Sequence, residues 1–174
     1  PKCDRLILST VKNKSNFKTL FSNKNFVLLN NSTPLPIKIL YKSPTSLGND
    51  RIALAVGATT NFPNKNVLVI DAGTCITYDL INSKKEYLGG SISPGIQMRY
   101  NALHQFTSQL PLLESVDTAM LTGVNTEESI HSGIINGVFV EIDGIIPRYT
   151  IPYPEVKVIV TGGNAKFFDK GLKN

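Results

Sequence analysis

Short runs of apolar residues, separated by polar turns, divide the chain into alternating strands and helices. Runs of about four to eight β-branched or leucine residues predict strands, and apolar residues that recur every third or fourth position predict helices. The predicted strands are residues 5–9, 26–29, 37–41, 67–70, 74–81, 87–92 and 156–160. The predicted helices are residues 16–22, 50–59, about 95–106, 126–146 and a last amphipathic segment that Asn164 caps.

Antiparallel hairpins within this alternation indicate a mixed-sheet α/β protein. The clearest hairpin joins the strands 67–70 and 74–81. A polar turn at residues 64–67 separates this hairpin from the helix before it. We therefore expect a domain boundary there, which divides residues 1–66 from residues 67–174.

The longest predicted helix has one apolar face. Thr126 is its expected cap, and isoleucine and valine recur at helical spacing between residues 130 and 145. Gly133 and Gly137 would allow another backbone to approach this helix closely, although each glycine costs a helix about 1 kcal/mol relative to alanine.

Residues 71–79, Asp-Ala-Gly-Thr-Cys-Ile-Thr-Tyr-Asp, form the most informative segment of the chain. Asp71 follows a buried strand, and Gly73 and Thr74 turn the chain into the next one. The glycine lets backbone N–H groups approach an anion, the hydroxyl donates to a phosphate oxygen, and the carboxylate holds a cation. The segment therefore predicts a nucleotide phosphate site, although a purely structural hairpin would also use Asp and Gly here.

A second candidate is the segment Gly48-Asn49-Asp50-Arg51 at a helix start. Asp50 could act as a general base that takes a proton from an attacking hydroxyl, and Arg51 could bind a substrate carboxylate. The structural alternative, which the segment alone favours, is that Asp50 caps the helix and Arg51 is solvated.

Two glycine-rich segments follow. Residues 89–95, Gly-Gly-Ser-Ile-Ser-Pro-Gly, predict a loop that enters a helix N-terminus, which either holds an anion or is a plain loop. Residues 161–163, Thr-Gly-Gly, follow a strand and either pass under an adenine or form a tight turn into a helix.

Composition narrows the classes of partner. Of the 174 residues, 41% are hydrophobic and 18% are charged, which is ordinary for a globular protein. The net charge of +5 comes from single lysines scattered over residues 1–50 with few interleaved aromatics, so we expect no nucleic-acid partner. No apolar run approaches the length of a membrane span, and Cys3 and Cys75 form no disulfide framework or metal site. We therefore expect no membrane partner and a cytoplasmic location.

Taken in order, these segments resemble the type III pantothenate kinases, members of the superfamily of acetate and sugar kinases, Hsp70 and actin. The matching segments are Gly48-x-Asp50-Arg51 for the family's G-x-D-R, Asp71-x-Gly73-Thr74-x-x-Thr77 for D-x-G-T-x-x-T, Gly89-Gly90-x-Ile92-x-Pro94-Gly95 for G-G-x-I-x-P-G, Ala102-Leu103 with Thr107-x-x-Leu110-Pro111 for T-A-x-L-P, and Thr161-Gly162-Gly163 for T-G-G. Five matches in the right order are far more specific than any one of them.

The resemblance implies a ribonuclease H-like (actin-like ATPase) fold of duplicated α/β domains, in which mixed sheets are flanked by helices. It also implies transfer of the γ-phosphate of ATP to pantothenate, which gives 4′-phosphopantothenate in the first step of coenzyme A biosynthesis. Asp50 would be the catalytic base, Thr74 would bind ATP, and Asp71 would bind a monovalent cation, K⁺ or NH₄⁺, in an enzyme that also uses Mg²⁺. The pantothenate site, near the interface of a homodimer, would consist of Tyr41, Gly48, Asn49, Asp50, Arg51 and Thr126.

The chain also departs from the family. The opening D-x-G-N-T/S turn, which holds ATP phosphates, is missing, and the last segment stops before the family's closing strand and helix. We therefore expect an internal portion of a longer protein, truncated at both ends and inactive by itself. A non-catalytic module that senses a nucleotide or metabolite on the same fold is the alternative, although a binder needs no base such as Asp50. A third hypothesis is a kinase of the same superfamily that phosphorylates a sugar or acetate. The resemblance of Tyr41 and the G-x-D-R segment to the family favours pantothenate as the acceptor.

Overall fold

The computed structural model describes residues 5–9, 25–29 and 33–168 of the chain. Within these ranges the strands are β1 (Arg5–Leu8), β2 (Asn25–Leu28), β3 (Lys38–Ile39), β4 (Val67–Ala72), β5 (Cys75–Ile81), β6 (Glu86–Pro94) and β7 (Lys157–Thr161). The helices are the 3₁₀ turn η1 (Pro44–Ser46), α2 (Asn49–Asn61), α3 (Ile96–Phe106), α4 (Thr126–Thr150) and α5 (Ala165–Phe168).

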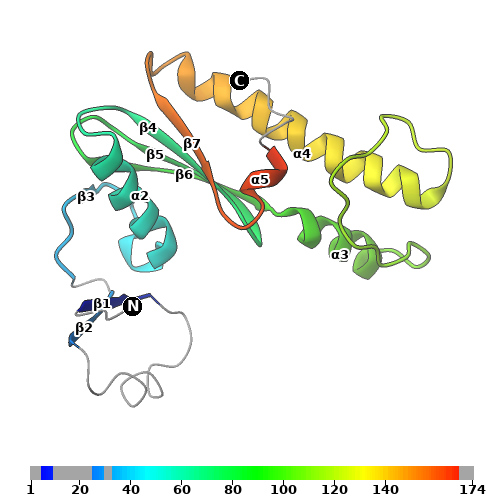
Figure 1. Ribbon diagram of the computed structural model, residues 1–174, viewed down its shortest axis with the longest axis horizontal. Helices are drawn as coiled ribbons and strands as arrows, with labels where there is room; N and C mark the ends of the chain where they lie inside the picture. The colour runs from blue at the N-terminus through cyan, green and yellow to red at the C-terminus, as the bar shows by residue number, and fades with distance from the viewer. Residues whose placement is uncertain (1–4, 10–24, 30–32, 169–174) are drawn as a thin grey trace.

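A mixed five-stranded sheet with the order β3-β6-β5-β4-β7 forms the centre of the structure (Figure 1). Strands β4, β5 and β6 form an antiparallel meander, β7 lies parallel to β4, and β3 lies parallel to β6. Strands β1 and β2 pair with each other in a separate parallel sheet. The mixed sheet and its helices confirm the predicted α/β class.

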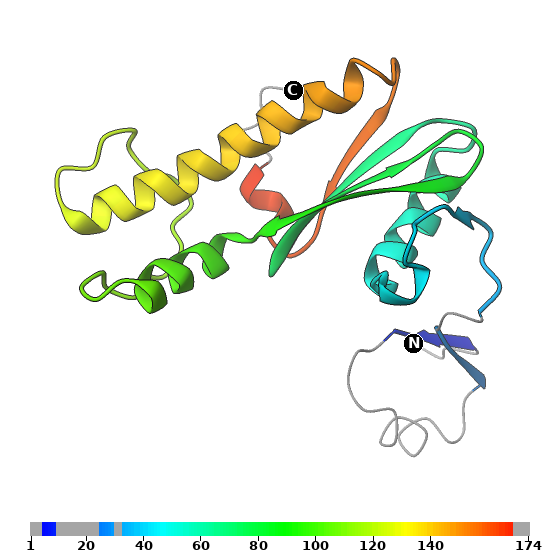
Figure 2. The ribbon, with the colours of Figure 1, turned by 180° about the vertical axis from the view of Figure 1, so that it is seen from behind.

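Helices cover both faces of the five-stranded sheet, as Figures 1 and 2 show from opposite sides. Because side chains alternate along a strand, Leu68 and Ile70 of β4 pack against α3, α4 and α5, whereas Val67 and Val69 pack against α2. We call these two sides of the sheet the α4 face and the α2 face. The first part of α4 extends past the sheet and packs beside α3 (Figures 1 and 2).

Most of the predicted strands and helices are confirmed, with differences at their ends. The predicted strand 37–41 is shortened to the two residues that pair with β6. The predicted strand 87–92 is confirmed and runs from Glu86 to Pro94 beside β5, so the competing prediction of a loop over 89–95 is wrong as far as Pro94. The predicted helix 16–22 lies outside the described residues.

The cap of α4 is Asn125 rather than Thr126. Asn125 has extended backbone angles, and its side chain accepts a hydrogen bond of 2.9 Å from the N–H of Glu128. The Glu128 carboxylate in turn accepts the N–H of Val124 at 2.9 Å. This reciprocal pairing satisfies orphan donors of the helix start, so Thr126 becomes the first helical residue.

The boundary at 66/67 stays a prediction. Two elements on its N-terminal side pack with the sheet that follows it: β3 pairs with β6, and Ile52 and Ala55 of α2 lie in the core of the α2 face. Residues 38–61 therefore belong to the same packed unit as β4 to β7.

Helix α4 corrects the expectation that no segment reaches the length of a membrane span. Among the described helices it alone is long and apolar enough to cross a membrane by length and composition. Its buried residues, which include Ile134, Val138 and Ile142, pack on the sheet in the core of the α4 face. Helix α4 therefore packs as a core helix does. Core helices can also be long and apolar enough to meet the criterion for a membrane span.

Replacing Gly90 by alanine is expected to destabilise the protein by about 1–3 kcal/mol, the usual cost of overpacking. A Cβ at this position would lie 1.7 Å from the backbone oxygen of Tyr78 and 3.0 Å from Asp79 Oδ1, so β6 would have to move away from β5. Urea unfolding measures the loss. The matched control is Gly57→Ala within α2, where a Cβ meets nothing within 4 Å and is expected to stabilise by about 0.5–1 kcal/mol. Equal stabilities of the two variants would contradict this account.

Candidate functional site

Three polar side chains of the hairpin share the α2 face of the sheet. Asp71 follows Val67 and Val69 in the alternation of β4, and Thr77 is its partner across the hairpin. Asp79 lies two residues farther along β5, on the same face as Thr77. Helix α2 covers this face, so the G-x-D-R segment at its start and the D-x-G-T-x-x-T hairpin are brought together.

Arg51 and Asp79 form a buried ion pair between α2 and β5. The Arg51 Nε lies 2.9 Å from Asp79 Oδ1 and 3.2 Å from Oδ2, and Nη2 lies 2.5 Å from Oδ1. The side chains are 7% and 0% exposed, which makes this a desolvated, hydrogen-bonded pair. Burial lowers the pKa of Arg51, but the hydrogen bond and charge of Asp79 outweigh it, so the net pKa is raised. Arg51 is therefore buried and paired. The structural alternative, which predicted a solvated Arg51, is wrong on this point.

Two tyrosine rings border this ion pair. The Arg51 Cζ lies 6.0 Å from the centre of the Tyr41 ring and 5.9 Å from that of Tyr87, and the two rings meet edge to face. The Tyr87 hydroxyl donates to Asp79 Oδ1 at 2.5 Å. Burial and this hydrogen bond to an anion raise the pKa of Tyr87 far above its usual range, so the hydroxyl stays protonated and remains a donor.

Asp50 is exposed in the first turn of α2, while its neighbour Arg51 is buried beneath it. The cap of α2 is Gly48 and not Asp50, because the helix begins at Asn49. The Asp50 carboxylate accepts the N–H of Arg51 at 2.9 Å. A Cβ on Gly48 would lie 2.3 Å from Asp50 Oδ1. The glycine of G-x-D-R thus leaves room for the carboxylate. Asn49 is also partly buried, and its side chain donates to the backbone oxygen of Leu29 at 3.2 Å.

Asp71 stands where β4 ends, beside the turn that follows β7. Burial raises the pKa of Asp71, and the negative charges of Asp50 and Asp79 raise it further. A Cβ on Gly162, which has a positive φ of 97°, would lie 2.4 Å from Asp71 Oδ1. The T-G-G segment therefore packs directly against the D-x-G-T segment, and Asp50 and Asp71 act on each other electrostatically.

Thr74 lines an open hollow of about 550 Å³ between the hairpin turn, the first turns of α3 and the T-G-G segment. Its exposed side chain shares the hollow with Gly163 and Asn164. A second hollow of about 670 Å³ adjoins it, since the two share Gln97, Gly163 and Asn164. Phe139 and Phe167 contribute aromatic rings to the second hollow. An anion over Thr74 would thus have room for an attached planar group beside it.

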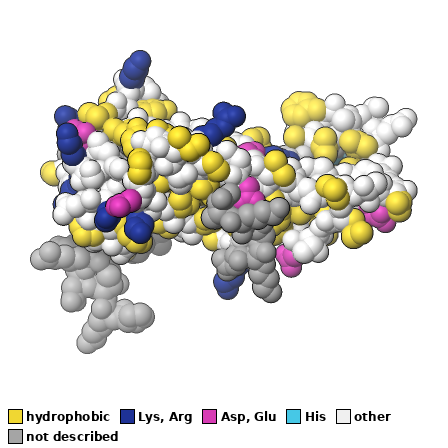
Figure 3. All heavy atoms as spheres, turned by 90° about the horizontal axis from the view of Figure 1, so that it is seen from above, with side chains coloured by type: hydrophobic (Ala, Val, Ile, Leu, Met, Phe, Trp, Pro, Cys, Tyr) yellow, Lys and Arg dark blue, Asp and Glu magenta, His cyan; other side chains and the backbone are white. Residues whose placement is uncertain are grey.

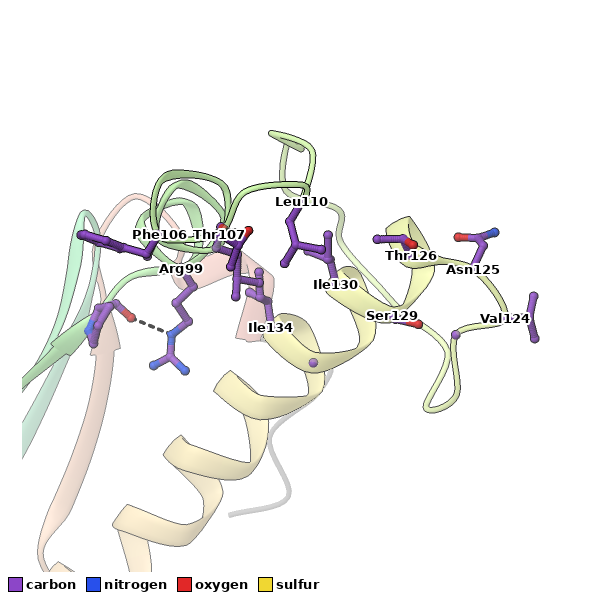
Figure 4. Close-up of a pocket in the computed structure, with 15 residues that line it drawn as sticks. Arg99, Phe106, Thr107, Leu110, Val124, Asn125, Thr126, Ser129, Ile130 and Ile134 are labelled. Atoms are coloured by element: carbon purple, nitrogen blue, oxygen red, sulfur yellow. Dashed lines mark hydrogen bonds between the residues drawn. The ribbon is translucent and has the colours of Figure 1, made fainter.

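Thr126 is not brought near the other predicted site residues. It is exposed at the start of α4, at the opposite end of the molecule from α2 in both Figure 1 and Figure 2. It borders an open, mostly apolar pocket of about 1020 Å³ between α3 and α4. In Figure 4 this pocket has Leu110, Ile130 and Ile134 on its inner side and Thr126 toward the helix start.

The sequence assigned no role to Asp79 or Tyr87, which form the centre of the ion pair network. A signal was present: Asp79 is a carboxylate within the otherwise apolar run of residues 78–81. No other local feature distinguishes this Asp from one in an ordinary hairpin.

The described residues contain no group of three or more His, Cys, Asp or Glu side chains that could hold a metal ion. Among these residues Asp71 therefore belongs to no cluster of protein side chains that could enclose a metal ion. A cation beside Asp71 would need further oxygen ligands from the backbone, water or phosphate, as Mg²⁺ does in kinase and ATPase sites.

Asp71→Asn is expected to raise the melting temperature at pH 7 in buffer without potassium. The pKa of Asp71 is higher in the folded protein than in the unfolded chain, so the protonated carboxyl favours the folded state. This contribution to stability is complete below the unfolded pKa and is lost as the pH rises through the folded pKa. The ionised form therefore costs stability at neutral pH, and the amide removes that cost. Thermal melts from pH 3 to pH 7 should show the difference vanish toward pH 3. A variant that melts lower at pH 7 would contradict the sign.

Comparisons with known proteins agree on one family. The sequence profile described as type III pantothenate kinase matches residues 6–148. A type III pantothenate kinase of Cytophaga hutchinsonii is 47% identical over 168 residues, which are 97% of this chain and 72% of that protein. One of Flavobacterium johnsoniae is 43% identical over 176 residues, which are 100% of this chain and 72% of that protein.

A solved structure shares the fold. The crystal structure of a conserved putative Baf family transcriptional activator from Campylobacter jejuni matches with a TM-score of 0.61 and 25% sequence identity. The match covers 95% of this chain and 71% of that one. It therefore includes both faces of the five-stranded sheet.

Proposed function

The chain belongs to the type III pantothenate kinase family, and from this we infer that it phosphorylates pantothenate with ATP as co-substrate. The product is 4′-phosphopantothenate, and the reaction is the first step of coenzyme A biosynthesis. The observation that supports this most directly is the exposed carboxylate of Asp50 beside Asp71, at the end of the sheet that also has the hollow over Thr74. The exposed base argues against the sensing module, because a binder does not need to take a proton.

We propose Asp50 as the general base. Its carboxylate accepts the proton of the pantothenate hydroxyl while that oxygen attacks the γ-phosphorus of ATP. The bond from the γ-phosphorus to the bridging oxygen breaks, and ADP leaves with the electron pair. Such a transfer requires mainly alignment and charge neutralisation, so a base that the backbone N–H of Arg51 orients suits it.

ATP is proposed to place its phosphates over Thr74 and its nucleoside in the adjoining 670 Å³ hollow. The Thr74 hydroxyl and the N-terminal turn of α3 offer donors to phosphate oxygens. Gly163 borders both hollows and has no side chain to narrow the passage between them.

Asp71 is proposed to hold the monovalent cation, K⁺ or NH₄⁺. It fits that role because it is a partly buried carboxylate whose neighbours Asp50 and Asp79 add negative charge, so that a cation would relieve the repulsion. Bound Mg²⁺ would neutralise charge on the ATP phosphates. Potassium is expected to raise the melting temperature of the unchanged protein and not that of Asp71→Asn; equal shifts would exclude Asp71 as the ligand.

The pantothenate site is proposed to combine residues of two subunits in a homodimer. Gly48, Asn49 and Arg51 flank Asp50 at the start of α2, and Tyr41 lies near Arg51. Thr126 lies at the opposite end of the molecule and would reach the site of a partner. Exposed hydrophobic side chains gather at that end, as Figure 3 shows from the α4 side; they are Phe106, Leu112, Met120, Leu121 and Val124. Patches of this kind mark interaction surfaces. Sedimentation equilibrium should give a dimer, and a monomer at micromolar concentration would refute it.

Two further expectations concern the domain architecture of the whole protein and its location in the cell. We propose that the duplicated actin-like ATPase fold holds for the whole protein, with β1 and β2 in the first domain, β4 to β7 in the second and the boundary between residues 66 and 67. We also propose a cytoplasmic location, where ATP and the coenzyme A precursors are available.

The deciding experiment is an ADP-release assay on the purified full-length protein with MgATP, pantothenate and K⁺. ADP release that requires both pantothenate and K⁺ supports the function. A folded protein that binds ATP without releasing ADP in the presence of pantothenate would refute it.

A further inference from the structure

We propose that Asp79 is a positioning residue for the acceptor substrate, because it fixes the guanidinium of Arg51, the residue that follows the proposed general base Asp50 in the first turn of α2. The inference rests on the proposed function and adds a residue to it. Asp79 has no contact with solvent, so it acts on a substrate only through Arg51.

The hydrogen bonds of the pair determine which part of Arg51 stays available. Asp79 takes Nε and Nη2 in a two-point contact, which fixes the plane of the guanidinium as well as its position. Nη1 is the nitrogen that Asp79 does not use. Arg51 thus presents one defined edge to an acceptor carboxylate rather than a mobile cation.

Asp79 is itself held from three directions. Oδ2 accepts the hydroxyl of Thr77 at 3.0 Å, and Oδ1 accepts that of Tyr87 at 2.5 Å. On the third side lies Gly90, where a Cβ would come within 3.0 Å of Oδ1, so there is no room for a larger residue beside the carboxylate. The carboxylate therefore has no alternative orientation, and neither does the arginine bound to it.

The same pairing explains how a buried arginine can serve binding without strong non-specific attraction. Asp79 cancels the charge of Arg51 at long range, so recognition depends on direction and short distance. We therefore expect the network to act on the KM for pantothenate more than on kcat or on the KM for ATP, whose hollow over Thr74 has none of these residues in its lining.

The test compares two tyrosine variants in the full-length protein. Tyr87→Phe removes the hydroxyl bond to Asp79 while leaving the ion pair and the ring in place. Tyr78→Phe is the matched control, because Tyr78 is equally buried, lies on the adjacent strand, and donates its hydroxyl to Glu141 at 2.7 Å on the α4 face. Tyr87→Phe is expected to raise the KM for pantothenate at least about threefold, with the KM for ATP unchanged; Tyr78→Phe should change neither.

Asp79→Asn gives the stronger version of the same test. It should raise the KM for pantothenate by about 10- to 100-fold, the usual effect of losing a residue that orients a ligand-binding group. Two outcomes would overturn this inference and leave the proposed function standing. One is the same KM for pantothenate in Tyr87→Phe and Tyr78→Phe. The other is an equal rise in the KM for pantothenate and the KM for ATP in an Asp79 or Tyr87 variant. Absence of turnover in the unchanged protein would overturn the proposed function and this inference with it.

Discussion

Asp50→Asn is expected to lower kcat for pantothenate phosphorylation by about 10²- to 10⁴-fold, the range that general base catalysis usually contributes. The amide keeps the shape of the side chain and can still accept the N–H of Arg51, so the start of α2 should stay folded. What it loses is the ability to accept the hydroxyl proton. Steady-state ADP release at saturating MgATP and pantothenate measures the change.

The matched control is Glu155→Gln, which removes a carboxylate from an exposed pair with Lys65. Exposed pairs contribute about 0–1 kcal/mol, so this variant should keep both its stability and its kcat. Turnover by Asp50→Asn within a factor of ten of the unchanged protein would show that another group takes the proton.

Arg51→Met is expected to lower the free energy of unfolding by about 3–5 kcal/mol, because it leaves the Asp79 carboxylate buried without its partner. Urea unfolding at pH 7 measures the loss. Removing both charges, in Arg51→Met with Asp79→Leu, should recover most of it, since an apolar pair of similar volume needs no compensation.

Lys65→Met is the control for Arg51→Met, because Lys65 belongs to an exposed pair and its loss should cost at most about 1 kcal/mol. If the double variant were as unstable as Arg51→Met alone, the loss would come from packing of the arginine stem rather than from the stranded charge.

Short apolar runs were sufficient to predict the sheet, because β4 and β5 are buried on both faces and therefore consist mainly of apolar residues. The apolar pattern was not sufficient to predict where each strand begins and ends. Gly89 and Gly90 were predicted both in a strand over 87–92 and in a loop over 89–95; both lie in β6, where a Cβ on Gly90 would meet the backbone of β5. Only the register of the neighbouring strand shows that a glycine is needed for space rather than for flexibility.

The motifs identified Asp50, Asp71 and Thr74, and the structure gathers these residues at one end of the sheet. The sequence could not identify the partner of Arg51, because Asp79 lies 28 residues away and meets it only through the packing of α2 on β5. Nor could it show that Thr126 is remote from Asp50 within one chain, since the length and direction of α4 determine that separation.

Strand β5 is paired on both edges, and residues 76–81 are all buried. Backbone amides in such a strand exchange with deuterium only when the whole domain unfolds. Asp79 thus belongs to the slowest-exchanging part of the molecule, whereas Asp50 stands in the exposed first turn of a helix, where local fraying is fastest. The proton acceptor can therefore move on a short timescale while the guanidinium next to it in sequence keeps a fixed partner.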